Sequence, residues 1–380
     1  MKFSCTKENL SRSLNITSRI TTKNINLPIL NNVLIDIRNK NLKLQSTNLE
    51  IFIISKTRAK IEEEGSFTLP AKLFSDYINL LPEERIDIEL IEGDIIKIEC
   101  GKFKTKIKGI SASEFPLIPE ISKENIFKVR IMDFKQMIEK VVFAASTNEI
   151  RPELSGVFFK LDYKENKLIS AATDSYRLAE NKIEVIESSG KIDEKGIIVP
   201  AKTLQEVTRI IGILKELPES SNEMEIAVGD NQVLFIYDDV EILSRLIEGN
   251  YPEYQHIIPS NFKTTAVLNK EELIKAIKVA SLFTKSNLND VHLEFSSKGE
   301  KGELIVSSAE NQIGENKISL DAQIDGEKNK IVLNYRYLID GLNIFNTEKI
   351  RLQLNDESTP CVVQGVGEKE CIYLVMPIKL

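Results

Sequence analysis

Two periodicities of apolar and polar residues alternate along the chain. A two-residue period, typical of strands, runs through residues 84–108, where Ile86, Ile88 and Leu90 alternate with polar residues and Gly93-Asp94 marks a turn. Helical spacing predicts six helices, near residues 6–19, 71–81, 133–147, 201–216, 270–285 and 335–345. The order helix, strands, helix, strands therefore occurs three times. It predicts an α+β fold in which pairs of helices pack on antiparallel sheet.

One strand-to-helix junction is written three times in the sequence. It spans residues 67–74, 196–207 and 330–338, and its aligned positions are Pro70, Pro200 and Asn334. Proline suits the first turn of a helix, because its missing N–H would have no helical partner there. The spacing is close to a third of the 380 residues, which predicts one folding unit repeated three times.

Three further landmarks follow the same period. Helix-capping patterns begin at Thr6, Asp133 and Asn269, each followed three residues later by Asn or by a Gln or Glu. Strand runs at 33–35, 157–159 and 291–293 precede second strands at 44–48, 169–174 and 305–310, and residues 112–119 match residues 249–259. The repeat predicts three similar domains, residues 1–122, 123–260 and 261–380, joined by short linkers.

Composition limits the class of protein. Hydrophobic residues at 42% and charged residues at 28% are typical of a soluble globular protein, and three domains of about 125 residues have the usual size. No apolar run approaches the ~20 residues that span a bilayer, and the N-terminus lacks the apolar stretch of a signal peptide. Cys5, Cys100, Cys361 and Cys371 show no CxxC spacing, so we expect reduced, mostly buried thiols and a cytoplasmic protein.

Motifs that carry chemistry are absent from the sequence. It contains no glycine-rich phosphate loop, no HExxH and no GxSxG. His256 and His292 lie in different repeats, which gives a histidine metal site little support. An enzyme with a nucleophile at the Thr173-Asp174-Ser175 turn is a weak hypothesis, because no base is expected within reach. We therefore expect no catalytic residues, no cofactor and no metal.

The distribution of charge bears on nucleic-acid binding. The net charge of −7 argues against a polyanionic partner. However, the helical windows carry 14 basic and 9 acidic residues, so the helices have a net charge of +5 and the rest of the chain −12. A polyanion meets the local surface rather than the net charge. Ordinary solvated lysines explain the same distribution, so charge alone leaves DNA binding open.

Several segments resemble one protein family. The stretch 171–179 (AATDSYRLA), the motif Tyr251-Pro252-Glu253-Tyr254 and the tail 373–380 (YLVMPIKL) are similar to the bacterial DNA polymerase III beta subunit, the replicative sliding clamp. Residues 27–32 and 70–72 are similar as well, so the resemblance covers the whole chain. It implies a non-enzymatic processivity factor of clamp fold, in which two copies join head to tail into a ring. Duplex DNA would pass through the ring regardless of its sequence.

The resemblance also implies partners and a binding site for them. The polymerase III catalytic subunit, the clamp loader and other proteins would dock through a short peptide with a Gln and a Leu/Phe end. The family's groove lies between the second and third repeats, and the matching positions are Leu154, Thr173, Ser175, Tyr176, Arg177, Leu178, Pro252, His256, Ile257, Leu374, Met376, Pro377, Ile378 and Lys379. Ser175-Tyr176 stands where the family often has Gly-His, and His256 and Lys379 stand where Arg is common, so peptide preference can differ.

The expected DNA and dimer contacts complete the prediction. Lys72 and Lys202 match basic positions of the family, Asn24 stands where Arg is common with Lys23 beside it, and the remaining expected DNA contacts are Arg209, Lys275 and Lys278. Pro152 and Glu153 replace aromatic residues that can touch DNA. Leu282 and Phe283 match the apolar pair of the dimer interface, with Thr105 and Ile107 opposite. The alternative is a three-repeat interaction scaffold that never encircles DNA.

Overall fold

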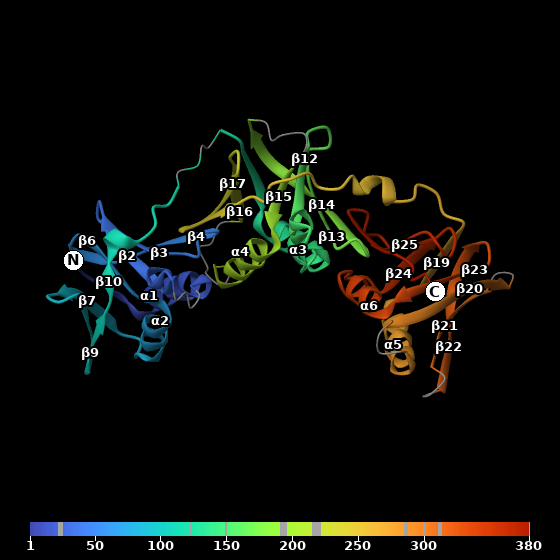
Figure 1. The fold of residues 1–380 in the computed structure, drawn as a ribbon, viewed down its shortest axis with the longest axis horizontal. Helices are drawn as coiled ribbons and strands as arrows, with labels where there is room; N and C mark the ends of the chain where they lie inside the picture. Colours follow the sequence, from blue (N-terminus) through green and yellow to red (C-terminus); the bar gives the residue numbers. More distant parts are fainter. Residues whose placement is uncertain are drawn as a thin grey trace. The chain divides into compact units, whose positions relative to one another are not determined.

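A computed structural model describes most of the 380-residue chain: residues 1–21, 26–119, 121, 124–148, 150–190, 196–214, 222–284, 288–298, 301–310 and 314–379. Two compact units are present. Unit 1 comprises Met1–Met132, Val185–Ile192 and Lys202–Leu246, and unit 2 comprises Asp133–Glu184, Asp193–Ala201 and Ile247–Leu380. Figure 1 shows the elements coloured along the chain.

The elements of the first third set the pattern. They are β1 (Lys2–Thr6), α1 (Lys7–Thr17), η1 (Ser18–Ile20), η2 (Pro28–Asn31), β2 (Asn32–Arg38), β3 (Asn41–Thr47), β4 (Ile51–Thr57), β5 (Lys60–Glu63), β6 (Gly65–Pro70), α2 (Ala71–Leu80), β7 (Arg85–Ile91), β8 (Ile95–Cys100), β9 (Phe103–Lys108), β10 (Ile110–Ser111) and η3 (Ala112–Glu114).

The second third repeats this order. Its elements are β11 (Ile126–Arg130), α3 (Ile131–Val141), η4 (Val142–Ala144), η5 (Pro152–Ser155), β12 (Gly156–Asp162), β13 (Lys167–Thr173), β14 (Arg177–Ser189), β15 (Ile197–Pro200), α4 (Ala201–Leu214), β16 (Glu223–Val228), β17 (Gln232–Tyr237), β18 (Val240–Arg245) and η6 (Tyr254–Ile257).

The last third repeats it again. Its elements are β19 (Thr264–Asn269), α5 (Lys270–Ala280), η7 (Ser281–Phe283), β20 (Asp290–Lys298), β21 (Lys301–Glu310), β22 (Gly314–Gly326), β23 (Asn329–Asn334), α6 (Tyr335–Asn343), β24 (Lys349–Leu354), β25 (Cys361–Gly365) and β26 (Cys371–Val375).

Strand pairing is the same in each third. The strand before the first helix pairs antiparallel with two others: β1 with β5 and β7, β11 with β14 and β16, and β19 with β22 and β24. The next strand also has two partners: β2 pairs with β3 and β6, β12 with β13 and β15, and β20 with β21 and β23. The predicted α+β fold with three similar repeats is therefore confirmed. The domain boundaries 1–122, 123–260 and 261–380 stay a prediction.

The strand-to-helix junctions lie where the sequence predicts them. Strands β6, β15 and β23 end at Pro70, Pro200 and Asn334, and α2, α4 and α6 begin at the next residue. Where proline is replaced by Asn334, its side-chain oxygen accepts the N–H groups of Arg336 and Tyr337 at 2.9 and 3.4 Å. The asparagine thus stabilises the first turn by a different means from proline.

Two of the three predicted helix caps are correct. Thr6 Oγ1 accepts the Asn9 N–H at 3.3 Å, and Asn269 Oδ1 accepts the Glu272 N–H at 3.1 Å. The predicted cap at Asp133 is wrong, because α3 begins at Ile131 and Asp133 lies inside its first turn. An acidic residue is also favoured there, since it complements the positive end of the helix dipole.

A main-chain hydrogen bond recurs at the start of the first helix of every repeat. The N–H of Lys7 donates to Glu84 O at 3.2 Å. The N–H of Ile131 donates to Asn222 O, and that of Lys270 donates to Glu348 O, both at 2.9 Å. Each bond ties the start of this helix to the segment that precedes the strand after the second helix.

In the second and third repeats, the last strand pairs with a strand of the preceding repeat. Strand β18 pairs with β4, placing Leu243 opposite Phe52, and β26 pairs with β14, placing Leu374 opposite Leu178. All four side chains are buried in apolar clusters. By their place in the repeat, β9 corresponds to β18 and β26, and β22 corresponds to β4 and β14. In the described part of the chain, β9 and β22 have no such neighbour across repeats.

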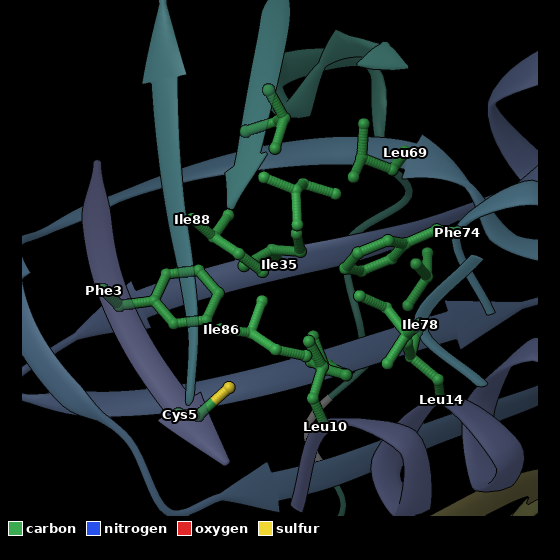
Figure 2. Close-up of a cluster of buried hydrophobic side chains, with 14 of the residues drawn as sticks. Phe3, Cys5, Leu10, Leu14, Ile35, Leu69, Phe74, Ile78, Ile86 and Ile88 are labelled. Carbon is green, nitrogen blue, oxygen red and sulfur yellow. The ribbon is translucent and has the colours of Figure 1, made fainter. Parts of the chain in front are cut away.

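The core of the first repeat shows how the helices attach to the sheet. Leu10 and Leu14 of α1 and Phe74 and Ile78 of α2 are spaced one helical turn apart, so each pair lies on one face. They pack on strand residues that include Phe3, labelled with them in Figure 2. Burying each such side chain stabilises the fold by roughly 1.5–3 kcal/mol.

Candidate functional site

The turn between β13 and β14 is held by its own side chains. Thr173 Oγ1 donates to Arg177 O at 2.6 Å and accepts the Ser175 N–H at 3.1 Å. Asp174 Oδ1 accepts the N–H groups of Tyr176 and Arg177 at 2.9 and 3.0 Å. Ser175 has φ of 78°, a left-handed conformation that favours glycine, which explains why the related family often has Gly here. The turn leaves the Tyr176 side chain 64% exposed.

The C-terminal segment lies beside this turn. Val375 pairs with Arg177 in the β14–β26 ladder, and the Met376 N–H donates to Tyr176 O at 2.8 Å. The Ile378 N–H donates to Val332 O at 2.8 Å, which holds the tail along β23. Residues 376–378 are half-buried and Lys379 is exposed. The structure therefore brings together the two segments that the sequence analysis assigned to one groove.

An apolar cluster lies beneath these two segments. Leu178 and Leu374 are opposite each other in the ladder and pack with Phe158 and Tyr254. Leu154, in η5, is only 3% exposed. These three leucines, which the resemblance places among the groove positions, are therefore buried core residues. The exposed or half-buried apolar atoms come from Tyr176, Ile257 and Met376.

Two tyrosines fix the segment that contains Pro252, His256 and Ile257. Tyr251 stacks on Phe158 with ring centroids 5.0 Å apart, and the buried Tyr254 donates from its hydroxyl to Glu180 Oε2 at 2.6 Å. Burial, together with the nearby Glu180 carboxylate, raises the pKa of the Tyr254 hydroxyl above its usual value. His256 is exposed, 3.2 Å from the Glu253 carboxylate.

Arg177 is already engaged within the protein. Its Nε donates to Asp174 Oδ2 at 3.0 Å, Nη1 to Asp340 Oδ2 at 2.7 Å and Nη2 to Phe143 O at 2.9 Å. The guanidinium also lies 4.6 Å from the centroid of the Tyr337 ring. These bonds hold α6 and the segment after α3 to the turn. Arg177, one of the expected groove residues, therefore has each of its three guanidinium nitrogens bonded within the protein.

The residues expected to contact DNA fall into three groups. Lys72, Lys202, Lys275 and Lys278 are exposed, and none of them forms an ion pair with another described residue. Arg209 is engaged: its guanidinium donates to the carbonyl oxygens of Asn15 and Ile16 at 3.0 Å and to Glu206 at 2.7 Å. Lys23 and Asn24 lie outside the described residues.

The repeat reveals a basic residue that the sequence analysis missed. Lys72 and Lys202 are each the second residue of the second helix in their repeat, and Arg336 occupies this position in the third. All three side chains are exposed. A positive charge at a helix N-terminus is disfavoured by the helix dipole. Three such charges at one repeated position are therefore not explained by helix stability.

The predicted interface residues have different surroundings. Leu282 is 71% exposed, and Phe283 and Thr105 are half-buried. Ile107 belongs to the buried core of the first repeat, so it is not available as an exposed apolar contact. Phe103, on the same strand, is 52% exposed. The alternation of apolar and polar residues does not show that Ile107 is buried and Phe103 exposed, because both are apolar residues of the same strand.

No feature of the described residues indicates catalysis. No group of three His, Cys, Asp or Glu side chains is placed to hold a metal ion. The four cysteines are buried and unpaired, and burial raises the pKa of the Cys5 and Cys361 thiols to about 12 and that of Cys371 to about 11. No described helix is long and apolar enough to cross a membrane.

The chain repeats a two-helix unit three times, and its sheets continue from one repeat to the next. It also has an exposed turn beside its tail and exposed basic residues on its helices. These features together are those of the DNA-clamp class. Comparison with known proteins specifies it further. Residues 1–119, 128–253 and 255–379 match the N-terminal, central and C-terminal domains of the DNA polymerase III beta subunit.

Relatives match over the full length of the chain. The beta sliding clamps of Synechocystis sp. and Staphylococcus aureus are each 30% identical, covering 100% of this chain and 100% and 99% of their own. The crystal structure of the DNA polymerase sliding clamp from Bacillus subtilis has 28% identity and a TM-score of 0.90, with 100% and 99% of the two chains covered.

The chain belongs to the DNA polymerase III beta subunit family, the bacterial sliding clamps. Its function is that of a DNA sliding clamp, a non-catalytic processivity subunit of the polymerase holoenzyme. The predicted family and function are confirmed, in place of the alternative, a three-repeat interaction scaffold that never encircles DNA.

Proposed function

We propose that two copies of the chain join head to tail into a ring by pairing β9 of one copy with β22 of the other. The observation that carries the proposal is that β9 and β22 stand where, at the two junctions within the chain, a strand of one repeat pairs with a strand of the next. An unpaired sheet edge tends to recruit another strand. Each copy offers one free edge of each kind, so two pairings close a finite ring.

The repeat also specifies the register of this pairing. Leu243 lies opposite Phe52 and Leu374 opposite Leu178, and the corresponding residues of β9 and β22 are Lys106 and Glu315. The same register places Lys104 opposite Lys317. It also places Thr105 opposite Asn316, whose buried Oδ1 has no hydrogen-bond partner among the described residues. The dimer junction would thus carry an ion pair where the junctions within the chain carry apolar pairs.

Charge reversal tests the register. Lys106→Glu should place like charges opposite each other and weaken the dimer, and adding Glu315→Lys should restore it. Lys104→Glu is the matched control on the same strand, and it should strengthen the dimer because it removes the repulsion from Lys317. Sedimentation velocity over a range of concentrations measures each dimer. If the double variant is no tighter than Lys106→Glu alone, the register is wrong.

Partner proteins would dock where the turn 173–178 meets the tail 374–379, in the groove position implied by the family. The half-buried Met376 beside the exposed Tyr176 and Ile257 suits an apolar anchor of a peptide, and binding energy usually concentrates in a few such anchors. We infer that the polymerase III catalytic subunit and the clamp loader use this site. We also infer that DNA is held without sequence preference by Lys72, Lys202 and Arg336, assisted by Lys275 and Lys278.

The three domains proposed from the sequence, residues 1–122, 123–260 and 261–380, would form six similar domains in the ring. A protein that works on bacterial DNA acts in the cytoplasm, in keeping with four unpaired cysteines. The test of the ring itself is retention on DNA. Loaded protein should stay on a nicked circle at a salt concentration that strips it from a short linear duplex. Equal loss from both would contradict encirclement.

A further inference from the structure

Arg209 occupies a defined site at the end of α1. Its Nη1 and Nη2 atoms donate to the main-chain oxygens of Asn15 and Ile16, both at 3.0 Å. Its Nε donates to Glu206 Oε2 at 2.7 Å, so the guanidinium is bonded on both sides. The carbonyl oxygens in the last turn of a helix form its negative end and favour a cation. The site therefore recognises a planar guanidinium, whose fork of donors matches paired oxygen atoms.

The corresponding place at the end of α3, where α6 of the third repeat takes the part of α4, contains a cavity. Asn343 holds the position in α6 that Arg209 holds in α4, because Asn334 and Pro200 end the equivalent strands. Glu139 and Lys140 of α3 correspond to Asn15 and Ile16 of α1. A cavity of about 410 Å³ lies here, and Glu139, Lys140 and Asn343 are among its lining residues. Its volume falls within the usual range of small-molecule sites.

The lining of the cavity suits a cation. Glu139 and Asp340 supply carboxylates, each with one oxygen already paired: Glu139 Oε1 lies 3.3 Å from Lys135 Nζ, and Asp340 Oδ2 accepts from Arg177 at 2.7 Å. The Lys140 ammonium pairs with Glu368 Oε2 at 2.7 Å, so its positive charge is balanced by a carboxylate that does not line the cavity. Among the described residues, no side chain donates to the carbonyl oxygens of Glu139 or Lys140. The Arg177 guanidinium binds the end of α3 at a different oxygen, Phe143 O at 2.9 Å. The two oxygens that correspond to the acceptors of Arg209 therefore have no side-chain donor among the described residues.

We propose that this cavity binds a guanidinium group, supplied by an arginine side chain of a partner or by a small guanidinium compound. Asn343 is too short to fill the place of an arginine, whereas an incoming guanidinium can reach the last-turn oxygens of α3. It can also pair with Glu139 Oε2 or Asp340 Oδ1, the carboxylate oxygens that do not contact Lys135 or Arg177. The cavity shares no lining residue with the apolar groove at Tyr176 and Met376, although Arg177 of the groove donates to Asp340 and Phe143 of the cavity. The proposed site does not depend on the proposed dimer.

The test uses the full-length protein with ¹³C-labelled isoleucine δ1-methyl groups, because Ile344 also lines the cavity. Titration with N-acetyl-L-arginine methylamide should shift the Ile344 signal with a Kd on the order of millimolar, as expected for a small ligand. The citrulline analogue has the same shape without the charge and should bind at least about tenfold more weakly. Methylguanidinium distinguishes a small guanidinium compound from an arginine side chain of a partner. If it binds as tightly as the arginine amide, the cavity recognises the guanidinium group alone. If it binds more weakly, the cavity recognises an arginine residue.

Substitutions at Asn343 locate the site. Asn343→Arg should place a guanidinium in the cavity, abolish the Ile344 shift and raise the temperature of unfolding. Asn41→Arg adds the same side chain on an exposed strand end and should leave binding unchanged. Asn343→Asp adds a carboxylate and should tighten binding, which gives a readout if the arginine variant folds poorly. Equal binding of the arginine and citrulline probes, or unchanged binding by Asn343→Arg and Asn343→Asp, would overturn the proposal.

Discussion

Replacing Arg177 with alanine should loosen the attachment of α6 and β26 to the turn at Thr173. The change removes three hydrogen bonds and leaves the Asp174 carboxylate, 15% exposed, without its cation. Breaking a buried ion pair costs about 3–5 kcal/mol. We expect about 3 kcal/mol here, because the Asp340 side chain is 48% exposed and water replaces part of its bond.

Hydrogen exchange measures this loss where it should occur. A cost of about 3 kcal/mol corresponds to a fall of roughly 100-fold in the protection of the β26 amides, provided that they exchange by opening of this region. Amides in β7 and β8 of unit 1 should keep their protection and serve as an internal control. Arg177→Lys keeps the charge with fewer donors and should lose less, and Asp340→Asn should lose at most about 1 kcal/mol. If Arg177→Ala leaves β26 protection within fivefold of the parent, the guanidinium does not hold these elements together.

Three other experiments test the DNA contacts, the groove and the buried thiols. Lys202→Glu should weaken binding of DNA in a filter or fluorescence assay and yet stabilise α4 by about 0.3–1 kcal/mol, because an acidic residue suits a helix N-terminus. A variant that loses both DNA binding and stability would contradict this assignment. Deleting Met376–Leu380 should abolish binding of a labelled Gln-x-x-Leu-Phe peptide and leave sedimentation as a dimer unchanged; equal peptide affinity would refute the groove. A thiol reagent at pH 8 should not label the native protein, because pKa values of about 12 at Cys5 and about 11 at Cys371 keep these thiols protonated; rapid labelling without denaturant would refute this.

The repeat made most of the fold predictable from the sequence. Pro70, Pro200 and Asn334 were placed to the residue, because a strand that leads into a helix needs a distinctive local pattern at one point. The cap at Asp133 failed for a local reason. An acidic residue is favoured both at the cap and inside the first turn, so its identity does not separate the two positions.

The candidate site was less predictable, because its bonds join residues distant in the sequence. Arg177 and Asp340 are 163 residues apart, and nothing near either residue indicates the other. The burial of Leu154 and Leu178 likewise follows from packing beneath η5 and β26, which the type of residue does not reveal. Family resemblance indicated which segments form the candidate groove, while the structure was needed to show which of their side chains are buried.

The main-chain bond at the start of α1, α3 and α5 limits how each repeat can change over evolutionary time. Because donor and acceptor are both backbone atoms, most side-chain replacements at Lys7, Ile131 and Lys270 leave the bond in place, which helps three repeats to keep one shape while their sequences drift apart. Proline is the exception, since it alone lacks the N–H. The first residue of a helix ordinarily accepts proline readily. In this fold, proline at Lys7, Ile131 or Lys270 would remove the main-chain hydrogen bond to Glu84, Asn222 or Glu348.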